Sequence, residues 1–319
     1  LVVTLPPGWS SVTQGGGGEP QPTGALHRNA WRETTPQEEI YLLASRYTVH
    51  QRRAGQTEVL VYLRRDDPTL ANKYLEVGGQ YLRMYAALLG PYPYPKFALV
   101  ENFWETGYGM PSFSLLGPRV IRFPFILHSS YPHEILHNWW GNSVFVDYET
   151  GNWCEGLTAY MADHLIKEQR GQGEEYRRDT LQKYRSYVRD GRDFPLTEFR
   201  SRHSAATEAI GYGKTLMMFH MLRLQIGDEA FSQGLARFYR KHRGSRAGFD
   251  DLRVVFEETS ESDLERFFAD WVETPGALDL DLSIDSVTQL GDDGWRIAGR
   301  LPQSQDGTIY DLSVPAVVL

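Results

Sequence analysis

The spacing of hydrophobic residues changes twice along the chain. Up to about residue 68, short runs rich in β-branched and aromatic residues alternate with polar ones, as in EEIYLLASRYTVHQ and TEVLVYLRR, which predicts strands. From Thr69 apolar residues recur at helical spacing as far as Gly90, a residue that commonly ends a helix. The period of two returns from Leu278 in LDLDLSIDSV, which is followed by a turn at GDDG and by WRIAGRL.

Helices dominate the middle of the chain. A strand is predicted at FALVENF, and a helix is predicted to begin near Ser129 or Ser130. Five later segments have helical spacing, and each is marked by a Gly, Asp or Ser: GEEYRRDTLQKYRSYVRD, GKTLMMFHMLRLQIG, DEAFSQGLARFYRKH, DDLRVVFEETS and SDLERFFADWVETPG. The run TQGGGGEPQPTG predicts a flexible loop that holds neither helix nor strand. We therefore expect an α+β chain with three domains, at residues 1–68, 69–276 and 277–319.

Composition narrows the class of protein. The chain has 319 residues, of which 41% are hydrophobic and 23% charged, as expected for a soluble globular protein. No apolar run approaches the ~18 residues that a membrane span requires. The net charge of −8 argues against a nucleic-acid partner, because phosphate binding needs a positive surface. The single cysteine, Cys154, excludes an intrachain disulfide but leaves the compartment open: cytoplasmic, periplasmic and secreted all remain. The abrupt ends, Leu1 and VPAVVL, suggest a fragment of a longer protein, so an absent signal peptide is uninformative.

The sequence YPHEILHNWWGN contains an H-E-x-x-H motif at His133, Glu134 and His137. Residues four apart lie on the same face of a helix, so both histidines can bind one metal ion. Glu134 stands beside the metal, where it can take a proton from a water. A catalytic zinc site has three protein ligands and one open position, and Glu155, which opens the next helical pattern, is the natural third ligand. The competing interpretation is a pair of histidines on a solvated helix face.

These residues resemble the zinc-binding core of the aminopeptidase N-like family of gluzincin metallopeptidases. The resemblance rests on HEILHNWWGN and WCEGLTAY, and it extends to AIGYGKTLMMFHML, ALLGPYPYPKFALV and FADWVETPGALDL. It implies a thermolysin-like, mostly helical catalytic domain at 69–276, which binds one Zn²⁺ and lies between two truncated β domains. It also implies that Tyr212 faces the metal and donates a hydrogen bond to the developing oxyanion.

Two departures from the family pattern affect the interpretation. Only 17 residues, Asn138 to Cys154, separate the second histidine from Glu155, one fewer than is usual in the family, and a deletion around Glu149–Gly151 accommodates this. The family's G-A-M-E-N motif, whose glutamate pairs with the substrate's amino group, is replaced by Tyr108-Gly109-Met110-Pro111-Ser112. Pro111 therefore stands where that glutamate would be. Glu105 or Glu101 are candidate substitutes.

The sequence therefore predicts a zinc peptidase in which Glu134 is the base and Tyr212 the oxyanion donor. Gly109, Met110 and Glu105 are predicted to bind a peptide or small-protein substrate, the first two as an edge strand. Asn138 and Asp163 are candidates for orienting the ligands. An aminopeptidase is the first interpretation. The alternatives are a zinc peptidase of endo- or altered terminal specificity and a non-catalytic scaffold.

Overall fold

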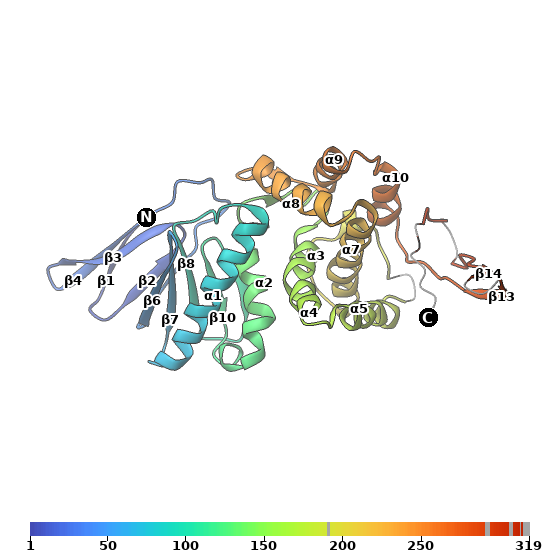
Figure 1. Cartoon of the computed structure of the whole chain (residues 1–319). Coiled ribbons are helices and arrows are strands. Elements are labelled where there is room, and N and C mark those ends of the chain that lie inside the picture. The colour runs from blue at the N-terminus through green and yellow to red at the C-terminus, as the bar shows by residue number, and fades with distance from the viewer. Residues whose placement is uncertain (190–191, 291–293, 306–308, 313, 315–319) are drawn as a thin grey trace.

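The computed structural model describes residues 1–189, 192–290, 294–305, 309–312 and 314. Strands together with helices α1 (Pro68–Leu89) and α2 (Ser130–Leu136) make up one half of the molecule, and a cluster of helices makes up the other (Figure 1). The hairpin of β13 (Ser283–Gln289) and β14 (Trp295–Arg300) projects beyond the helical half (Figure 1). No helix among the described residues is long and apolar enough to cross a membrane.

A five-stranded sheet is the centre of the first half. Its strand order is β6 (Thr48–Ala54), β7 (Thr57–Leu63), β8 (Lys96–Glu101), β10 (Phe113–Leu116) and β9 (Gly107–Met110). The pairs β7–β8 and β8–β10 are parallel, whereas β6–β7 and β10–β9 are antiparallel. Helix α1 (Pro68–Leu89) links the parallel strands β7 and β8 and packs on β6 and β7.

The sheet separates two hydrophobic cores. Because side chains alternate across a strand, Val59 and Val61 of β7 join the large core with α1, while Leu60 and Tyr62 join a small cluster on the other face. That cluster also contains Val12 of β2 (Ser10–Thr13), which pairs with β5 (Leu42–Ser45). The sheet is therefore covered on both faces.

The glycine-rich run that was predicted to be a loop is a strand, so this prediction was wrong. Strand β3 (Gly16–Thr23) pairs with β4 (Leu26–Arg32), which also pairs with β1 (Val2–Leu5) in the order β1-β4-β3. The prolines are tolerated because β3 is an edge strand, where a missing N–H need not break a ladder. The register shifts between Gly17 and Pro20, and positive φ values at Gly17 and Gly18 accommodate this bulge.

The motif helix follows two short 3₁₀ turns. The apolar run VIRFPFIL forms η1 (Val120–Arg122) and η2 (Pro124–His128), and helix α2 (Ser130–Leu136) begins after Ser129. The chain then pairs β11 (Phe145–Val146) in parallel with β12 (Arg246–Ala247), which ties this segment to the helical half.

The second half is helical. Helix α3 (Cys154–Ala159), the π-helical η3 (Tyr160–His164) and α4 (Leu165–Gln169) follow one another without a break. The remaining helices are α5 (Gly173–Tyr187), η4 (Leu196–Glu198), α6 (Ala205–Glu208), η5 (Ala209–Lys214), α7 (Thr215–Ile226), α8 (Asp228–His242), α9 (Phe249–Ser260), α10 (Glu265–Phe268) and η6 (Ala269–Glu273). Each of the five predicted helical segments overlaps one or two of these elements, although some segments extend past the helix ends.

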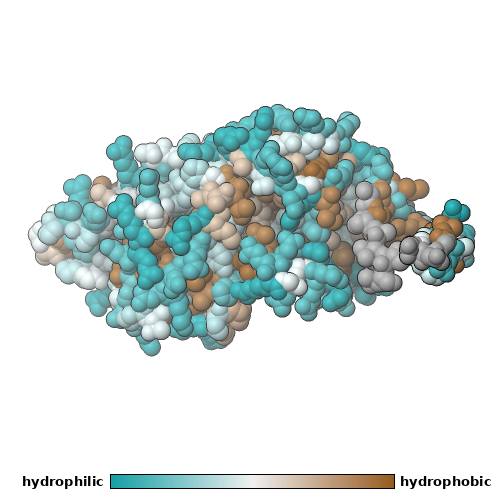
Figure 2. All heavy atoms as spheres, viewed as in Figure 1, coloured by the Kyte–Doolittle hydropathy of each residue, from teal (hydrophilic) through white to brown (hydrophobic). Residues whose placement is uncertain are grey.

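The C-terminal hairpin consists of β13 (Ser283–Gln289) and β14 (Trp295–Arg300). Every residue of both strands is exposed. Figure 2 shows hydrophobic and hydrophilic residues side by side at this end of the molecule. The predicted turn GDDG lies largely outside the described residues, as does most of VPAVVL. The three domain boundaries remain predictions. The five-stranded sheet takes strands from both sides of the boundary proposed at residue 68.

Candidate metal and active site

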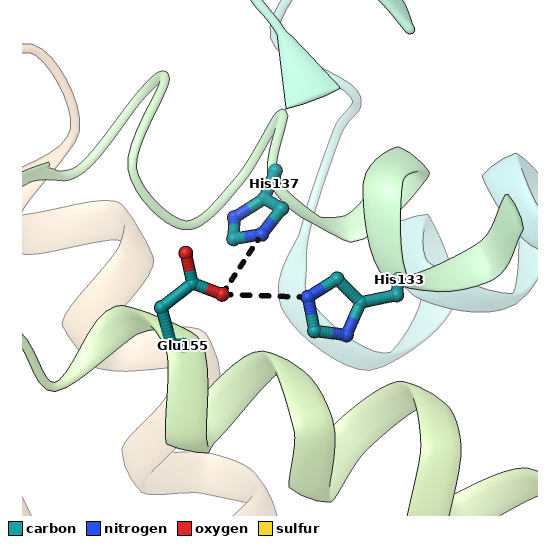
Figure 3. Close-up of side chains that lie close together, drawn as sticks. All are labelled: His133, His137 and Glu155. Carbon is teal, nitrogen blue, oxygen red and sulfur yellow. Dashed lines mark ion pairs between the residues drawn. The ribbon is translucent and has the colours of Figure 1, made fainter. Parts of the chain in front are cut away.

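Three side chains converge between α2 and α3. His133 and His137 lie four residues apart at the C-terminal end of α2, and Glu155 is the second residue of α3. Figure 3 shows the two imidazole rings and the carboxylate directed toward one another, with Nε2 of His133 3.4 Å and Nε2 of His137 3.5 Å from Oε2 of Glu155. Their potential ligand atoms all lie within 4.8 Å of one another.

This spacing fits a zinc-sized ion. Tetrahedral zinc binds nitrogen and oxygen at about 2.0–2.1 Å, which places neighbouring ligand atoms about 3.3–3.4 Å apart. The two measured distances of 3.4 and 3.5 Å agree with that edge length. Two of the three ligand-to-ligand distances therefore match a tetrahedral zinc site, and His133, His137 and Glu155 could hold a metal ion.

The outward-facing nitrogens of both histidines have partners. Nδ1 of His133 lies 2.8 Å from Oδ2 of Asp163 in η3, and Nδ1 of His137 lies 3.2 Å from the carbonyl oxygen of Trp140. Such partners fix the tautomer in which Nδ1 carries the proton and Nε2 is free to bind a metal. Sγ of Cys154 also lies 3.5 Å from Nδ1 of His137.

The electrostatics of this group favour positive charge. Burial, the largest effect, would lower the pKa of His133, yet the charge and hydrogen bond of Asp163 raise that pKa to about 10. The pKa of His137 is likewise raised against burial, by Cys154 and Glu155, and the two histidines hold the pKa of Glu155 well below its usual range. The raised histidine pKa values show that the surrounding groups create a negative potential at this position. The same potential attracts a metal cation.

The side chain of Glu134, on α2, faces the edge strand β9. A Cβ built on Gly109 would lie 2.8 Å from Cβ of His137 and 3.0 Å from Oε2 of Glu134, and one built on Gly107 would lie 3.3 Å from Oε1 of Glu134. Only glycine therefore allows β9 to approach the motif helix so closely. Burial raises the pKa of Glu134, which makes its carboxylate a stronger base.

These residues line a large cavity. Its volume is about 1170 Å³, and His133, Glu134, His137, Glu155 and Tyr212 all contribute to its wall. The carboxylates on the wall outnumber the lysine and arginine side chains: they are Glu38, Glu105, Glu134, Glu155, Asp163 and Glu208, against Lys183 and Arg202. A peptide-sized ligand bearing a positive charge therefore suits the cavity.

Tyr212 lies in the π-helical segment η5 and faces the metal-binding group. Its ring is stacked on that of His133, with centroids 6.4 Å apart and planes inclined by 13°. Burial and the charge of Glu155 raise the pKa of the Tyr212 hydroxyl, so the hydroxyl keeps its proton and remains a hydrogen-bond donor. Asp163 and Tyr212 both lie in π-helical turns, which occur often at functional sites.

Of the three predicted substrate-binding residues, Gly109 and Glu105 line the cavity, whereas Met110 does not line it. Gly109 lies in β9, and Met110 ends that strand against the small core. Glu105 lines the cavity, but its carboxylate accepts hydrogen bonds from the backbone N–H groups of Arg119 and Val120. Glu101, the other candidate, is buried and pairs with Arg122. Both carboxylates therefore already have partners.

Asn138 and Asn142 hold β9 and the turn that follows it. The side-chain oxygen of Asn138 accepts a hydrogen bond from the N–H of Ser112 at 2.8 Å, so Asn138 supports the turn after β9 and contacts neither histidine in this way. Asn142 donates to the carbonyl oxygen of Gly109 at 3.0 Å, a contact that sequence reasoning missed. Its sequence position, five residues after His137, gives no signal of that contact because the partner strand lies about 30 residues away along the chain.

Comparisons with known proteins find similarity to peptidases. Residues 129–271 match the family model of the "Peptidase family M1 domain". The chain is 26% identical to "Aminopeptidase M1-D" of Oryza sativa subsp. japonica over 220 residues, which is 63% of this chain and 25% of that protein. It is 23% identical to "Alanine/arginine aminopeptidase" of Saccharomyces cerevisiae over 314 residues, or 88% of this chain and 35% of that protein. The matched region thus spans only about a quarter to a third of the length of these two relatives.

Solved structures share the fold. The M1 zinc metallopeptidase from Deinococcus radiodurans matches with a TM-score of 0.67 at 18% identity, over 86% of this chain and 62% of that one. A two-domain M1 zinc metallopeptidase variant bound to L-arginine gives a TM-score of 0.68 at 18% identity, over 86% of this chain and 63% of that one. The mixed α+β architecture expected from the sequence is therefore confirmed.

Proposed function

From the premise that residues 129–271 are a peptidase family M1 domain in an aminopeptidase N-like family member, we propose that this chain is a zinc-dependent metallopeptidase that hydrolyses peptide bonds. The observation that carries the proposal is the agreement of the His133, His137 and Glu155 donor atoms with tetrahedral coordination, beside the free carboxylate of Glu134. A bound zinc ion supplies Lewis-acid chemistry, which polarises a carbonyl group and makes a water molecule more acidic.

The residues of the chain perform the proton transfers. Glu134, whose pKa is raised by burial, takes a proton from the attacking water and passes it to the departing amine. Tyr212 keeps its proton and donates a hydrogen bond to the oxygen of the scissile carbonyl, where negative charge develops. Strand β9 is the edge of its sheet among the described strands, and it binds the substrate backbone beside Glu134.

An aminopeptidase is the more strongly supported specificity. The excess of carboxylates on the cavity wall attracts a free amino group, and the similar proteins from Oryza sativa and Saccharomyces cerevisiae are named aminopeptidases. The alternative is a zinc peptidase that cuts internally or at blocked termini. Pro111 favours it, because no carboxylate follows β9, and Glu105 and Glu101 already have partners.

Two matched substrates decide between these specificities. We expect zinc-loaded protein to cleave an aminoacyl amide with a free amino group and to leave its N-acetylated counterpart intact. The Glu134→Gln variant should lose about 10²–10⁴-fold in kcat, the usual contribution of a general base. Cleavage of the acetylated substrate would instead support the alternative. Zinc binding without cleavage of either substrate would favour a non-catalytic scaffold.

A further inference from the structure

The hairpin turn that ends the edge strand β9 contains a residue in a rare backbone conformation. Met110 at the end of β9 pairs with Phe113 at the start of β10. The turn between them therefore consists of two residues, Pro111 and Ser112. Ser112 is fully buried and has a φ of 66°, a value that few residues other than glycine adopt. Among the described non-glycine residues only Glu261, which ends helix α9, also has a positive φ.

The turn is not of a kind that a two-residue hairpin adopts readily. Such hairpins usually have turns of types I′ and II′, which match the twist of the flanking strands and need a positive φ at the first central residue. Pro111 occupies that position, and its ring fixes φ near −65°. Proline followed by a residue of positive φ is typical of a type II turn, whose second central residue is usually glycine or asparagine. The conformation of Ser112 therefore needs support from the rest of the molecule.

Hydrogen bonds from two neighbouring segments supply that support. The N–H of Ser112 donates to Oδ1 of Asn138 at 2.8 Å, and its carbonyl oxygen accepts from the N–H of Ala98 on β8 at 3.0 Å. The hydroxyl of Ser112 accepts a hydrogen bond from Nζ of Lys96 at 2.8 Å. Every polar group of Ser112 thus has a partner, and the surroundings determine the conformation of the turn.

Lys96 joins the turn to the N-terminal strands. This lysine on β8 is buried, and its Nζ also donates to the carbonyl oxygen of Thr13 on β2 at 2.7 Å. The same Nζ lies 5.3 Å from the ring centroid of Trp31 on β4 and 5.7 Å from that of Phe113. Lysine is almost never fully buried unless it is paired, and here its partners are the turn and β2. Lys96 therefore fixes the end of β9 relative to the N-terminal strands.

Asn138 joins the same turn to the metal-binding group. It directly follows His137, and its Nδ2 donates to the carbonyl oxygen of Ile135 on α2 at 2.8 Å. Four residues further on, Asn142 donates to the carbonyl oxygen of Gly109 in β9. Strand β9 is thus held, at Gly109 and at its terminal turn, by two side chains that follow the second histidine. The edge strand and the metal-binding histidines are therefore fixed relative to each other.

We propose that Ser112 and Lys96 are positioning residues, which hold β9 in the arrangement that a peptide backbone needs in order to pair with it beside Glu134. This inference rests on the proposed peptidase function and deepens it, because it favours substrates long enough to pair with several residues of β9. A strand that is fixed before the substrate arrives costs little conformational entropy on binding. A loosened strand must be ordered by the substrate, which weakens binding of the ground state and the transition state alike.

Ser112→Gly tests the proposal without breaking the turn, because glycine suits the second central position of a type II turn. The substitution removes the hydroxyl that Lys96 contacts and frees the backbone. With zinc-loaded protein and a five-residue alanine peptide that has a free amino terminus, we expect KM to rise about tenfold at unchanged kcat. For alanine p-nitroanilide, which is too short to pair along β9, kcat/KM should fall by no more than about twofold.

Ser114→Ala is the matched control. It removes a buried hydroxyl on β10 that has no hydrogen-bond partner among the described residues, and it should keep the wild-type KM for the peptide. Lys96→Met tests the other side of the contact in a double-mutant cycle. Each single substitution should raise KM about tenfold, and the double variant should stay well below the hundredfold product, because both substitutions remove the same hydrogen bond. Effects that multiply would contradict the coupling of Ser112 to Lys96.

A Ser112→Gly variant with the wild-type KM for the peptide, or one that loses equally on both substrates, overturns the inference while the proposed function stands. If the wild type does not cleave the peptide, peptide binding to zinc-loaded Glu134→Gln protein, with and without Ser112→Gly, decides the inference. Fluorescence polarisation of the peptide, labelled at its C-terminus, measures this binding. Binding that Ser112→Gly weakens about tenfold supports the inference, whereas unchanged binding, or none, overturns it. Cleavage of neither substrate by the wild type contradicts the proposed function as well.

Discussion

Oδ2 of Asp163 lies 2.8 Å from Nδ1 of His133, so a carboxylate on the helix after Glu155 orients a histidine on the motif helix. The two residues are 30 positions apart in the chain. This contact leaves Nε2 of His133 as the metal-binding nitrogen, and it raises the basicity of the ring.

We therefore predict that Asp163→Asn weakens zinc binding about 10–100-fold, the usual effect of removing a partner of a metal-binding histidine. The substitution keeps the size of the side chain and removes its charge. Zinc affinity is measured by competition with a chelator on metal-free protein. Asp179→Asn, an exposed aspartate on α5, is the control and should bind zinc like the wild type. Equal affinities for all three proteins would mean that Asp163 does not support the site.

Tyr212→Phe removes the proposed hydrogen bond to the scissile carbonyl oxygen and keeps the ring that stacks on His133. We predict that kcat falls about 10²–10³-fold while zinc content is unchanged, because such a donor acts on the charge that develops during reaction. Steady-state kinetics with a free-amine peptide checks this. Tyr176→Phe, on the same cavity wall, should change kcat little. A Tyr212→Phe variant with wild-type kcat would assign the tyrosine a packing role.

Gly109→Ala tests the close approach of β9 to the motif helix. The new Cβ would lie 2.8 Å from Cβ of His137 and 3.1 Å from the backbone oxygen of Glu134, and neither atom can move without moving α2. We predict a fall in kcat/KM of about 100-fold, the effect of displacing reacting groups by about 1 Å. Gly107→Ala, which meets only a side-chain oxygen at 3.3 Å, should cost much less. Equal activity of both variants would contradict this geometry.

Lys96 gives the unfolding free energy a pH dependence that is independent of the metal site. Nζ of Lys96 is buried and donates hydrogen bonds to the carbonyl oxygen of Thr13 and the hydroxyl of Ser112, and burial lowers the pKa of Lys96 to about 7. The unfolded chain, with a pKa near the ordinary 10.5, binds more protons between pH 7 and 10.5. Stability therefore rises with pH across that window, by up to about 1.4 kcal/mol per unit, and the destabilising effect is fully present below pH 7.

We predict that Lys96→Met removes this rise. The free energy of unfolding, measured in urea between pH 7.5 and 9.5, should depend less steeply on pH in the variant than in the wild type. Lys73→Met replaces an exposed lysine on α1 and should leave the wild-type slope intact. An unchanged slope in Lys96→Met would show that Lys96 stays charged in the folded chain.

The sequence alone can nominate His133, His137 and Glu155 as metal ligands because the information that points to them is local. Two histidines four apart on a helix face the same side whatever surrounds them, and Glu155 opens the next helical pattern. The sequence offers Asp163 as a candidate for orienting a ligand, but its pairing with His133 depends on a π-helical turn and on the approach of two helices. No periodicity in the sequence reports either feature.

In the half of the molecule that contains the sheets, edge strands and the hydrogen-bond partners of polar side chains are difficult to predict from the sequence. The strand at Gly16–Thr23 contradicts local propensity, and it exists because pairing with β4 at a sheet edge tolerates glycine and proline. Glu105 was proposed as a substrate-binding residue because the sequence gives no sign that its carboxylate already has partners. Those partners, the N–H groups of Arg119 and Val120, are about 15 residues away in the chain. Composition cannot reveal that its carboxylate is already engaged.

The most direct test of the central claim is the zinc content of purified chains, measured by elemental analysis after removal of loosely bound metal. We predict one zinc ion per chain in the wild type and in Glu134→Gln, whose side chain stands beside the site, and less than about a tenth of that in His137→Ala, which lacks a ligand. A wild-type chain without zinc, or a His137→Ala variant that keeps it, would contradict the assignment of His133, His137 and Glu155 as the metal-binding group.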